Sequence, residues 1–200
     1  MIKTVIFDIG NVLVNFHWRE MFKEKGLEGE TFDRVAKATT QSPIWCEIDR
    51  GILNYEEVLD AFVKSDREME SEIRRALENT YSIITKRDFA IPWICDLKER
   101  GLQVLVLSNF GKKLIDDNAD VMEFLSYTDG GILSYKEHLL KPEPEIYELL
   151  LDRYGLKAEE CVFIDDLQGN IDAAKAQGIH GIVFQNYEQA VTELNRMLEN

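Results

Sequence analysis

FDIGNVLV, residues 7–14, ends an apolar run with a carboxylate and then turns. The preceding run KTVIF, residues 3–7, has the pattern of a buried strand, so Asp8 stands at the carboxyl end of that strand. Gly10 and Asn11 follow, and both residue types are typical of a tight turn. A buried strand that delivers one carboxylate to a polar turn suggests a functional site. Gly10 is notable because a second carboxylate at its position would form a pair with Asp8.

Short apolar runs and helical periods alternate through the second half of the chain. Strands are predicted at 102–108, 130–134, 161–165 and 181–184. Helices are predicted at 92–100, 143–154 and 170–177, and from 187 to the C-terminus. Strands that alternate with helices in this way predict an α/β fold with a parallel sheet covered on both faces.

Residues 16–87 have a different pattern. They are strongly polar, contain no convincing strand, and show helical spacing such as Tyr55, Val58, Leu59 and Phe62. Asn54 offers a helix cap immediately before this group. We therefore expect a helical insertion at 16–87 in a core made of residues 1–15 and 88–200.

Composition limits the classes of partner and compartment. The 200 residues carry a formal net charge of −14, which argues against binding to nucleic acid or to an anionic membrane surface. No apolar run is long enough to span a bilayer, and the first residues read as a strand and not as a signal peptide. The three cysteines, Cys46, Cys95 and Cys161, are too few for a disulfide or zinc framework and are expected to be buried small side chains. A cytoplasmic protein is expected, of unknown oligomeric state.

Polar residues follow several of the predicted strands. In an open parallel sheet, ligands bind outside the carboxyl ends of the strands. Any one such residue is better explained as a helix cap, a turn or a surface residue, but their joint occurrence at successive strand ends favours a site. The candidates are Asp8, Ser108, Asn109, Asp165 and Asp166, together with Lys141 before the helix at 143–154.

This set of residues suits the chemistry of phosphate transfer. A carboxylate can attack phosphorus and form an aspartyl phosphate, which splits one hard hydrolysis into two easier steps. Carboxylates also hold Mg²⁺, which neutralises the charge of a phosphoryl group, and without a cation three crowded carboxylates would repel one another. Lys141 supplies compensating charge, and Ser108 with the amides after it can donate to phosphate oxygens. Mg²⁺ and a small phosphorylated substrate are therefore expected, even in a chain of charge −14.

The segments FDIGNVLV, LSNF, LKPEPEIY and FIDDLQGN, in this order, resemble the four motifs of the haloacid dehalogenase-like hydrolase superfamily. The likeness is strongest to its subfamily I phosphatases, in the branch of glucose-1-phosphate phosphatases and the phosphatase domain of soluble epoxide hydrolase. It covers essentially the whole chain. It implies a Rossmann-like core with an inserted helical cap domain, and a Mg²⁺-dependent phosphatase acting on a small metabolite such as an anomeric sugar phosphate.

The resemblance also implies roles for individual residues. Asp8 would be the nucleophile, and Lys141 would orient it, balance charge and help to bind the phosphate. Ser108 and Asn109 would contact the phosphate as well.

A second group would form the metal site. The resemblance implies that Asp8, the backbone carbonyl of Gly10 and Asp166 hold Mg²⁺. Asp165 would be a further ligand or a partner of the ligands. Asn170 would support the metal loop, and a helix-capping role for it is equally compatible with its position.

Gly10 departs from the family pattern, because most of the family's phosphatases have an aspartate there that protonates the leaving oxygen. Loss of a positioned general acid costs on the order of 10²–10⁴-fold in rate. The cost is smaller for an acidic leaving group, so Gly10 is compatible with phosphates of the anomeric hydroxyl. Asn15 and His17 lie just beyond the motif, although a lone histidine there is more often structural.

Two alternatives to a phosphatase stay open. Haloacid dehalogenases also lack the acid, and an arginine of their cap helps to hold the halide, for which Arg19, Arg34 and Arg50 are the candidates. They need no metal and usually lack the acidic pair of FIDD, which favours the phosphatase. A catalytically weak regulatory or binding protein of the same superfamily is the second alternative.

The cap is expected to select the substrate by closing over the site. Trp45, Glu47 and Arg50 could line a pocket of the size of a sugar. Packing of Trp45 and a solvated ion pair of the other two are equally compatible with the pattern.

Overall fold

The computed structural model describes residues 1–199, and its core is a five-stranded sheet in the order β5–β4–β1–β6–β7. All neighbouring strands are parallel. The strands are β1 Thr4–Phe7, β4 Gln103–Ser108, β5 Gly131–Leu133, β6 Cys161–Asp165 and β7 His180–Val183. The predicted α/β class is confirmed, and the strands lie within a residue or so of their predicted positions.

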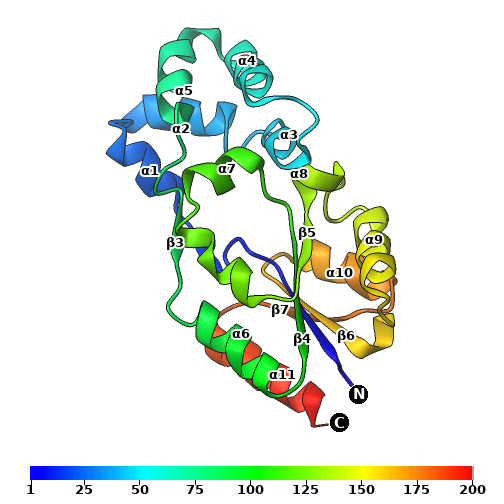
Figure 1. Cartoon of the computed structure of the whole chain (residues 1–200). Coiled ribbons are helices and arrows are strands. Elements are labelled where there is room, and N and C mark those ends of the chain that lie inside the picture. The colour runs from blue at the N-terminus through cyan, green and yellow to red at the C-terminus, as the bar shows by residue number, and fades with distance from the viewer. Residues whose placement is uncertain (200) are drawn as a thin grey trace.

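Helices cover both faces of the sheet (Figure 1). Successive side chains of β1 point to opposite faces, so Val5 and Phe7 join one hydrophobic cluster and Ile6 joins the other. The first cluster contains residues of α6 Ala90–Glu99 and α11 Tyr187–Leu198, and the second contains residues of α9 Pro144–Tyr154 and α10 Gln168–Ala176. These are the four helices expected from the sequence. The expectation for the last helix also included residue 200, which lies outside the described residues.

Short helical segments of the core were not expected from the sequence. Each is too brief to show a helical period of its own. They are α7 Lys112–Asp117, η2 Val121–Tyr127, α8 Ser134–Glu137 and η3 Ala158–Glu160.

The helices between strands β2 Val14–Phe16 and β3 Ile84–Lys86 form a separate layer beyond the carboxyl ends of the core strands (Figure 1), and we call them the cap. They are α1 Trp18–Glu24, α2 Gly29–Ala38, α3 Trp45–Arg50, α4 Tyr55–Ser65, η1 Arg67–Met69 and α5 Glu70–Leu77. The expected cap at Asn54 is present as a reciprocal pair, in which Asn54 Oδ1 accepts from the Glu57 amide at 3.0 Å and the Glu57 carboxylate accepts from the Asn54 amide at 2.8 Å. The helical insertion predicted from the sequence is therefore confirmed.

A two-stranded antiparallel ribbon joins the cap to the core. It pairs β2 Val14–Phe16 with β3 Ile84–Lys86. The expectation that residues 16–87 contain no strand is wrong, because a three-residue strand is too short to give a period-2 signal and is held by its partner. The division of the chain at 15/16 and 87/88 stays a prediction, since the ribbon passes from one part to the other.

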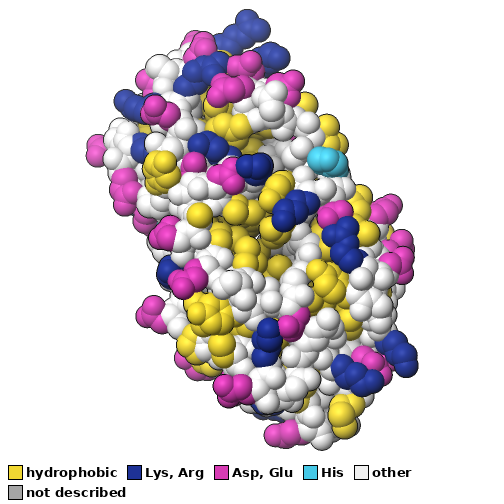
Figure 2. Space-filling model, in the orientation of Figure 1, with side chains coloured by type: hydrophobic (Ala, Val, Ile, Leu, Met, Phe, Trp, Pro, Cys, Tyr) yellow, Lys and Arg dark blue, Asp and Glu magenta, His cyan; other side chains and the backbone are white. Residues whose placement is uncertain are grey.

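Two further expectations concern the surface and the cysteines. Figure 2 shows acidic and basic side chains interspersed over one face, with hydrophobic side chains gathered around a hollow in its middle.

No helix within residues 1–199 is long and apolar enough to cross a bilayer. All three cysteines are free, as expected, but only Cys161 is buried, whereas Cys46 and Cys95 are partly exposed on their helices.

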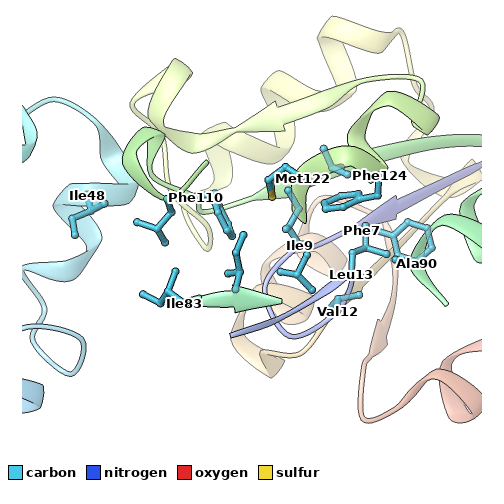
Figure 3. Close-up of a cluster of buried hydrophobic side chains, with 14 of the residues drawn as sticks. Phe7, Ile9, Val12, Leu13, Ile48, Ile83, Ala90, Phe110, Met122 and Phe124 are labelled. Carbon is cyan, nitrogen blue, oxygen red and sulfur yellow. The ribbon is translucent and has the colours of Figure 1, made fainter. Parts of the chain in front are cut away.

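The helix α3 is the part of the cap that is fixed most closely to the core. Figure 3 shows Ile48 of α3 at one end of a hydrophobic cluster whose other end is formed by core residues such as Phe124 and Ala90. Ser134 Oγ donates a hydrogen bond to the Asp49 carbonyl at 2.6 Å. Polar and apolar contacts therefore hold α3 in one place above the core.

Gly51, directly after α3, allows this close approach. It has a φ of 69°, and a Cβ added there would lie 2.8 Å from the Tyr135 carbonyl oxygen. Gly26 has a similar φ of 74°, but a Cβ added there would meet nothing within 4 Å. Both glycines therefore have a left-handed backbone, but only Gly51 lies so close to another segment that a Cβ would clash with it.

We expect Gly51→Ala to destabilise the protein more than Gly26→Ala. Both substitutions place a side chain in the left-handed region, at a cost of about 1–2 kcal/mol. Gly51→Ala also forces Cβ against the backbone of Tyr135, which should add about 1–3 kcal/mol, as overpacking does. Urea unfolding of the two variants measures the difference, and equal midpoints would show that α3 does not need this contact.

Candidate active site

The carboxylates predicted at the strand ends meet at one edge of the sheet. Phe7 pairs with Ile164 in the parallel register of β1 and β6, so Asp8 and Asp165 lie on neighbouring strands at the same level. Oxygen atoms of Asp8, Asp165 and Asp166 lie within 4.8 Å of one another. Asp8 and Asp165 are buried and Asp166 is partly exposed. The sheet therefore assembles three acidic groups from two strand ends.

Lys141 lies between two of these carboxylates. Its Nζ donates to Asp8 Oδ1 at 2.7 Å and to Asp165 Oδ2 at 2.6 Å, and its side chain is 2% exposed. Burial alone would lower the pKa of Lys141, but the charges of Asp8 and Asp165 outweigh this effect and hold that pKa above its usual range. Lys141 is thus a permanent cation at the centre of the site.

Asn109 fixes the backbone that carries Lys141. Its Oδ1 accepts from the Lys141 amide at 2.8 Å, and its Nδ2 donates to the Lys141 carbonyl at 2.9 Å. This reciprocal pair was not evident from the sequence, in which the two residues stand far apart. The side chain of Asn109 also lines the central cavity, so a phosphate contact by it stays a prediction.

Asp165 and Asp166 have different environments although they are adjacent in the chain. Asp165 accepts hydrogen bonds on both oxygens from Asn170 Nδ2, at 3.1 and 3.0 Å, and one from the Leu167 amide at 2.8 Å, besides its contact with Lys141. Asp166 accepts at Oδ2 from Asn11 Nδ2 at 3.0 Å. Asp165 is therefore occupied in holding the loop and Lys141, and Asp166 retains the greater capacity to bind a cation.

The electrostatic balance of the site favours a divalent cation. Burial raises the pKa of Asp8 to about 6, and the neighbouring Asp165 adds to this increase, while Lys141 opposes it. Burial also raises the pKa of Asp166. Three carboxylates against one lysine leave an excess of negative charge, and carboxylate oxygens are the donors that Mg²⁺ prefers. The donor set fits Mg²⁺.

A cavity of about 260 Å³ opens over these groups. Asp8, Gly10, Lys141 and Asp166 line its core side, and the cap contributes residues of α3. Ser108 Oγ, at the end of β4, is buried beside Asp8 and lowers the pKa of that carboxyl, and no other hydrogen-bond partner of it lies within residues 1–199. The predicted site residues are therefore gathered around or beneath one cavity.

Several residues weighed from the sequence do not line this cavity. His17 lies 3.7 Å from Glu20, and Asn15 donates to Thr85, so neither takes the place of the missing acid in this structure. Among the arginines, Arg19 stacks on Trp18, Arg34 pairs with Asp66 and Glu68, and Arg50 pairs with Glu143. Of the residues named in the cap, Trp45 lines the cavity, whereas Glu47 and Arg50 do not.

Two residues of the site were missed by sequence reasoning. Asn11 adopts a φ of 57° and bonds Asp166, and its position after Gly10 in a turn was the available signal. Asp49 lies on α3 and lines the cavity opposite the core residues. In the sequence, Asp49 is distinguished only by its place before Arg50 and Gly51 at the end of a helix. Acidic residues at such places are common on solvent-exposed helices, so the sequence did not indicate a role for it.

A family model described as "haloacid dehalogenase-like hydrolase" matches residues 2–178. The chain is a haloacid dehalogenase-like hydrolase. The resemblance inferred from the four motifs is thereby confirmed, as is the assignment of the chain to the enzymes.

The curated relatives of this hydrolase are distant. Acyl-CoA dehydrogenase family member 10 of Mus musculus is 26% identical over 98% of this chain, and flavin mononucleotide hydrolase 1 of Arabidopsis thaliana is 24% identical over 76%. Bifunctional epoxide hydrolase 2 of Mus musculus is 32% identical over 50%. The matched parts make up 19%, 61% and 19% of these relatives, so this chain corresponds to only a part of each.

Solved structures share the fold. A hydrolase from Porphyromonas gingivalis described as HAD-like superimposes with a TM-score of 0.75 at 20% identity, over 100% of this chain and 99% of that chain. A HAD family enzyme from Bacteroides thetaiotaomicron, in complex with magnesium and inorganic phosphate, gives 0.73 at 22%, over 95% and 99%. The L-2-haloacid dehalogenase of Xanthobacter autotrophicus gives 0.61 at 17%, over 90% and 76%. These likenesses establish the fold with its cap, and they do not separate phosphatase from dehalogenase.

We expect Lys141→Met to destabilise the metal-free protein by about 3–5 kcal/mol at pH 8, because it leaves two buried carboxylates without their cation. Lys141 opposes the increase in the pKa of Asp8, so that pKa rises further in the variant. The loss of stability should therefore shrink as the pH falls to 5 and Asp8 takes up a proton.

Urea unfolding in EDTA at both pH values measures this effect. Lys3→Met, which removes an exposed ion pair with Glu160, is the control and should cost at most about 1 kcal/mol. A loss for Lys141→Met that is no larger than that of the control would contradict the account of the site.

We expect Mg²⁺ to stabilise the wild type and to stabilise Asp166→Asn much less. At about a hundred times its Kd the ion contributes about 2.7 kcal/mol, or roughly 5–10 °C in Tm for a chain of this length. In EDTA, Asp166→Asn should not be less stable than the wild type, because burial already opposes the charge of Asp166. Thermal unfolding with and without Mg²⁺ tests both points.

Asp172→Asn, an exposed change on α10, is the matched control and should keep the full Mg²⁺ shift. An unaltered shift in Asp166→Asn would remove Asp166 from the metal site.

Proposed function

We propose that this hydrolase is a Mg²⁺-dependent phosphatase that cleaves a small sugar phosphate, esterified at the anomeric hydroxyl, through an aspartyl phosphate on Asp8. The observation that carries the proposal is the buried Lys141 between Asp8 and Asp165, beside the partly exposed Asp166. A halide displacement at carbon needs no metal and would leave the partly exposed Asp166 carboxylate without a role. A Mg²⁺-dependent phosphate transfer uses Asp166 as well as Asp8.

Asp8 is held in a position to attack. Lys141 binds its Oδ1, and Oδ2 lies on the side of Gly10, where a Cβ added to the glycine would be 3.9 Å away. Oδ2 forms the new bond to phosphorus, the bond from phosphorus to the substrate oxygen breaks, and its electron pair leaves with that oxygen. Bound Mg²⁺, held by Asp8, Asp166 and the Gly10 carbonyl, would neutralise negative charge on the phosphoryl group.

The second half of the reaction releases phosphate. A water molecule attacks the phosphorus of the aspartyl phosphate, and the bond to Asp8 breaks with its electrons returning to the carboxylate. Lys141 stabilises that carboxylate as it forms, and Ser108 Oγ donates to the phosphoryl oxygens. Asn170 and Asn109 keep Asp165 and Lys141 in place during both steps.

The substrate proposal follows from the shape of the cavity and from Gly10. Its volume, about 260 Å³, is at the lower end for ligand pockets and suits a small metabolite. Trp45 and Phe16 provide an apolar wall, against which a sugar ring can pack. With no acid at Gly10, the anomeric hydroxyl is favoured over other sugar hydroxyls because it is the more acidic leaving group.

The dehalogenase alternative is less well supported. The candidate arginines are paired elsewhere or stacked, and none lines the cavity. A dehalogenase also has no need of a set of donors that fits a metal.

We expect purified protein to release phosphate from glucose 1-phosphate in the presence of Mg²⁺ and not in EDTA, and to prefer it to glucose 6-phosphate. Asp8→Asn should lose at least about 10³-fold in kcat, because the isosteric amide cannot attack phosphorus. The assay measures phosphate and, with a 2-haloacid, halide. Halide release without metal, and no phosphate release, would show that the protein is a dehalogenase. No activity in either assay would favour a regulatory protein.

A further inference from the structure

The space beside the nucleophile, where a second carboxylate would stand, is open. A Cβ added at Gly10 would meet only Asp8 Oδ2, at an ordinary contact distance of 3.9 Å, and Gly10 does not have a positive φ. Packing therefore does not require a glycine here. The absence of an acid at this position raises the question of which other group in the cavity can exchange a proton with the substrate.

Asp49 of the cap is such a group. It lines the same cavity as Asp8 and Lys141, and it is close enough to both for their charges to act on it. The other acidic residues that line the cavity, Asp8 and Asp166, have the nucleophile and metal roles. Glu47 on the same helix does not reach the cavity.

The position of Asp49 is fixed from both sides. Ser134 Oγ donates to its carbonyl, and the following Arg50 pairs with Glu143 at 2.6 Å. The preceding Ile48 is buried in the cluster that joins cap and core. The Asp49 carboxylate itself accepts a hydrogen bond from the backbone amide of Gly111. A carboxylate fixed in this way can be held at the distance and angle to the substrate oxygen that proton transfer requires.

The direction of the reaction also favours a group on the cap. Attacking and leaving oxygens lie roughly in line through phosphorus. Asp8 attacks from the sheet edge of the core, so the leaving oxygen departs on the opposite side, toward the cap. Asp49 is the one cavity-lining residue of the cap, within the described part of the chain, whose side chain can carry an exchangeable proton at neutral pH.

The pKa of the partly exposed Asp49 also lies near neutral pH. Burial raises its pKa to about 7. The hydrogen bond from Gly111 and the charge of Lys141 oppose this increase, and the negative charge of Asp8 adds to it. A group with a pKa near the working pH is the most effective general acid and base.

We propose that Asp49 is a catalytic residue, the general acid and base that replaces the carboxylate absent at Gly10. This inference rests on the proposed phosphatase function but not on the preference for an anomeric leaving group, which a general acid at Asp49 would make unnecessary. In the first step the protonated Asp49 gives its proton to the substrate oxygen as the bond to phosphorus breaks, so that a neutral alcohol leaves and the aspartyl phosphate forms. In the second step the Asp49 carboxylate takes a proton from the attacking water, whose oxygen joins phosphorus, and inorganic phosphate and the protonated Asp49 result.

The test is Asp49→Asn on substrates with different leaving groups. The amide can still accept the Gly111 hydrogen bond, so the cap stays docked, but it cannot donate an acidic proton. We expect kcat/KM for an alkyl phosphate such as glycerol 1-phosphate to fall by on the order of 10²–10⁴-fold. With 4-nitrophenyl phosphate, whose leaving group needs no proton, kcat/KM should change less than about tenfold.

Two further readouts report the two roles separately. Asp49→Asn should release one nitrophenolate per active site in a burst and then turn over slowly, because the aspartyl phosphate forms but its hydrolysis lacks the base. With the wild type, kcat/KM for the alkyl phosphate should decline above about pH 7 as Asp49 loses its proton, and this decline should be absent in the variant. Gly10→Asp added to Asp49→Asn should restore part of the alkyl phosphatase activity, since its Cβ fits.

Asp33→Asn makes the same chemical change at an exposed site of the cap and should behave as the wild type. Equal losses for both substrates would show that Asp49 only positions the cap, and no loss for either would show that it takes no part, so either result overturns the proposal. If the wild type releases no phosphate from any substrate, the phosphatase itself is wrong, and the assignment of Asp49 is wrong with it.

Discussion

A single buried lysine holds the site together. Lys141 joins the ends of β1 and β6 by binding Asp8 and Asp165, and its charge offsets the cost of burying these two carboxylates. Its backbone is fixed in turn by Asn109 after β4. Three strand ends are thereby tied to one cation. The arrangement concentrates negative charge at the edge of the sheet, and that charge suits a divalent metal and, in the proposed function, a nucleophile.

Much of the core and its carboxylates could be predicted from the sequence, because parallel strands bring their carboxyl ends to one edge whatever the details of packing. This rule, together with the apolar runs in the sequence, was enough to predict that strand ends bring Asp8, Asp165 and Asp166 together. The hydrogen bonds that separate Asp165 from Asp166 could not be predicted, since they depend on how the loop of Asn170 folds back. The ribbon β2–β3 was missed because each strand is stabilised by its distant partner.

The cap was predictable as a set of helices but not as a part of the site. Its helical periods indicate which residues are buried, whereas the face that meets the core is decided by contacts between segments far apart in the chain. Gly51 against Tyr135 and Ser134 against Asp49 are such contacts. Trp45, Glu47 and Arg50 looked equally suited to the cavity, and only the docking of α3 shows that Trp45 faces it and Arg50 is held by Glu143.

The placement of Asp49 on the cap would give this hydrolase a different dependence on closure from one whose acid stands beside the nucleophile. An acid at Gly10 would be ready whether or not the cap were docked. An acid on α3 reaches the leaving oxygen only when Ile48, Asp49 and Arg50 are seated on the core. Proton transfer would then be confined to the closed state, from which bulk water is largely excluded. A substrate that holds the cap open would lose the acid as well as its binding contacts, so the same movement would select the substrate and permit the chemistry.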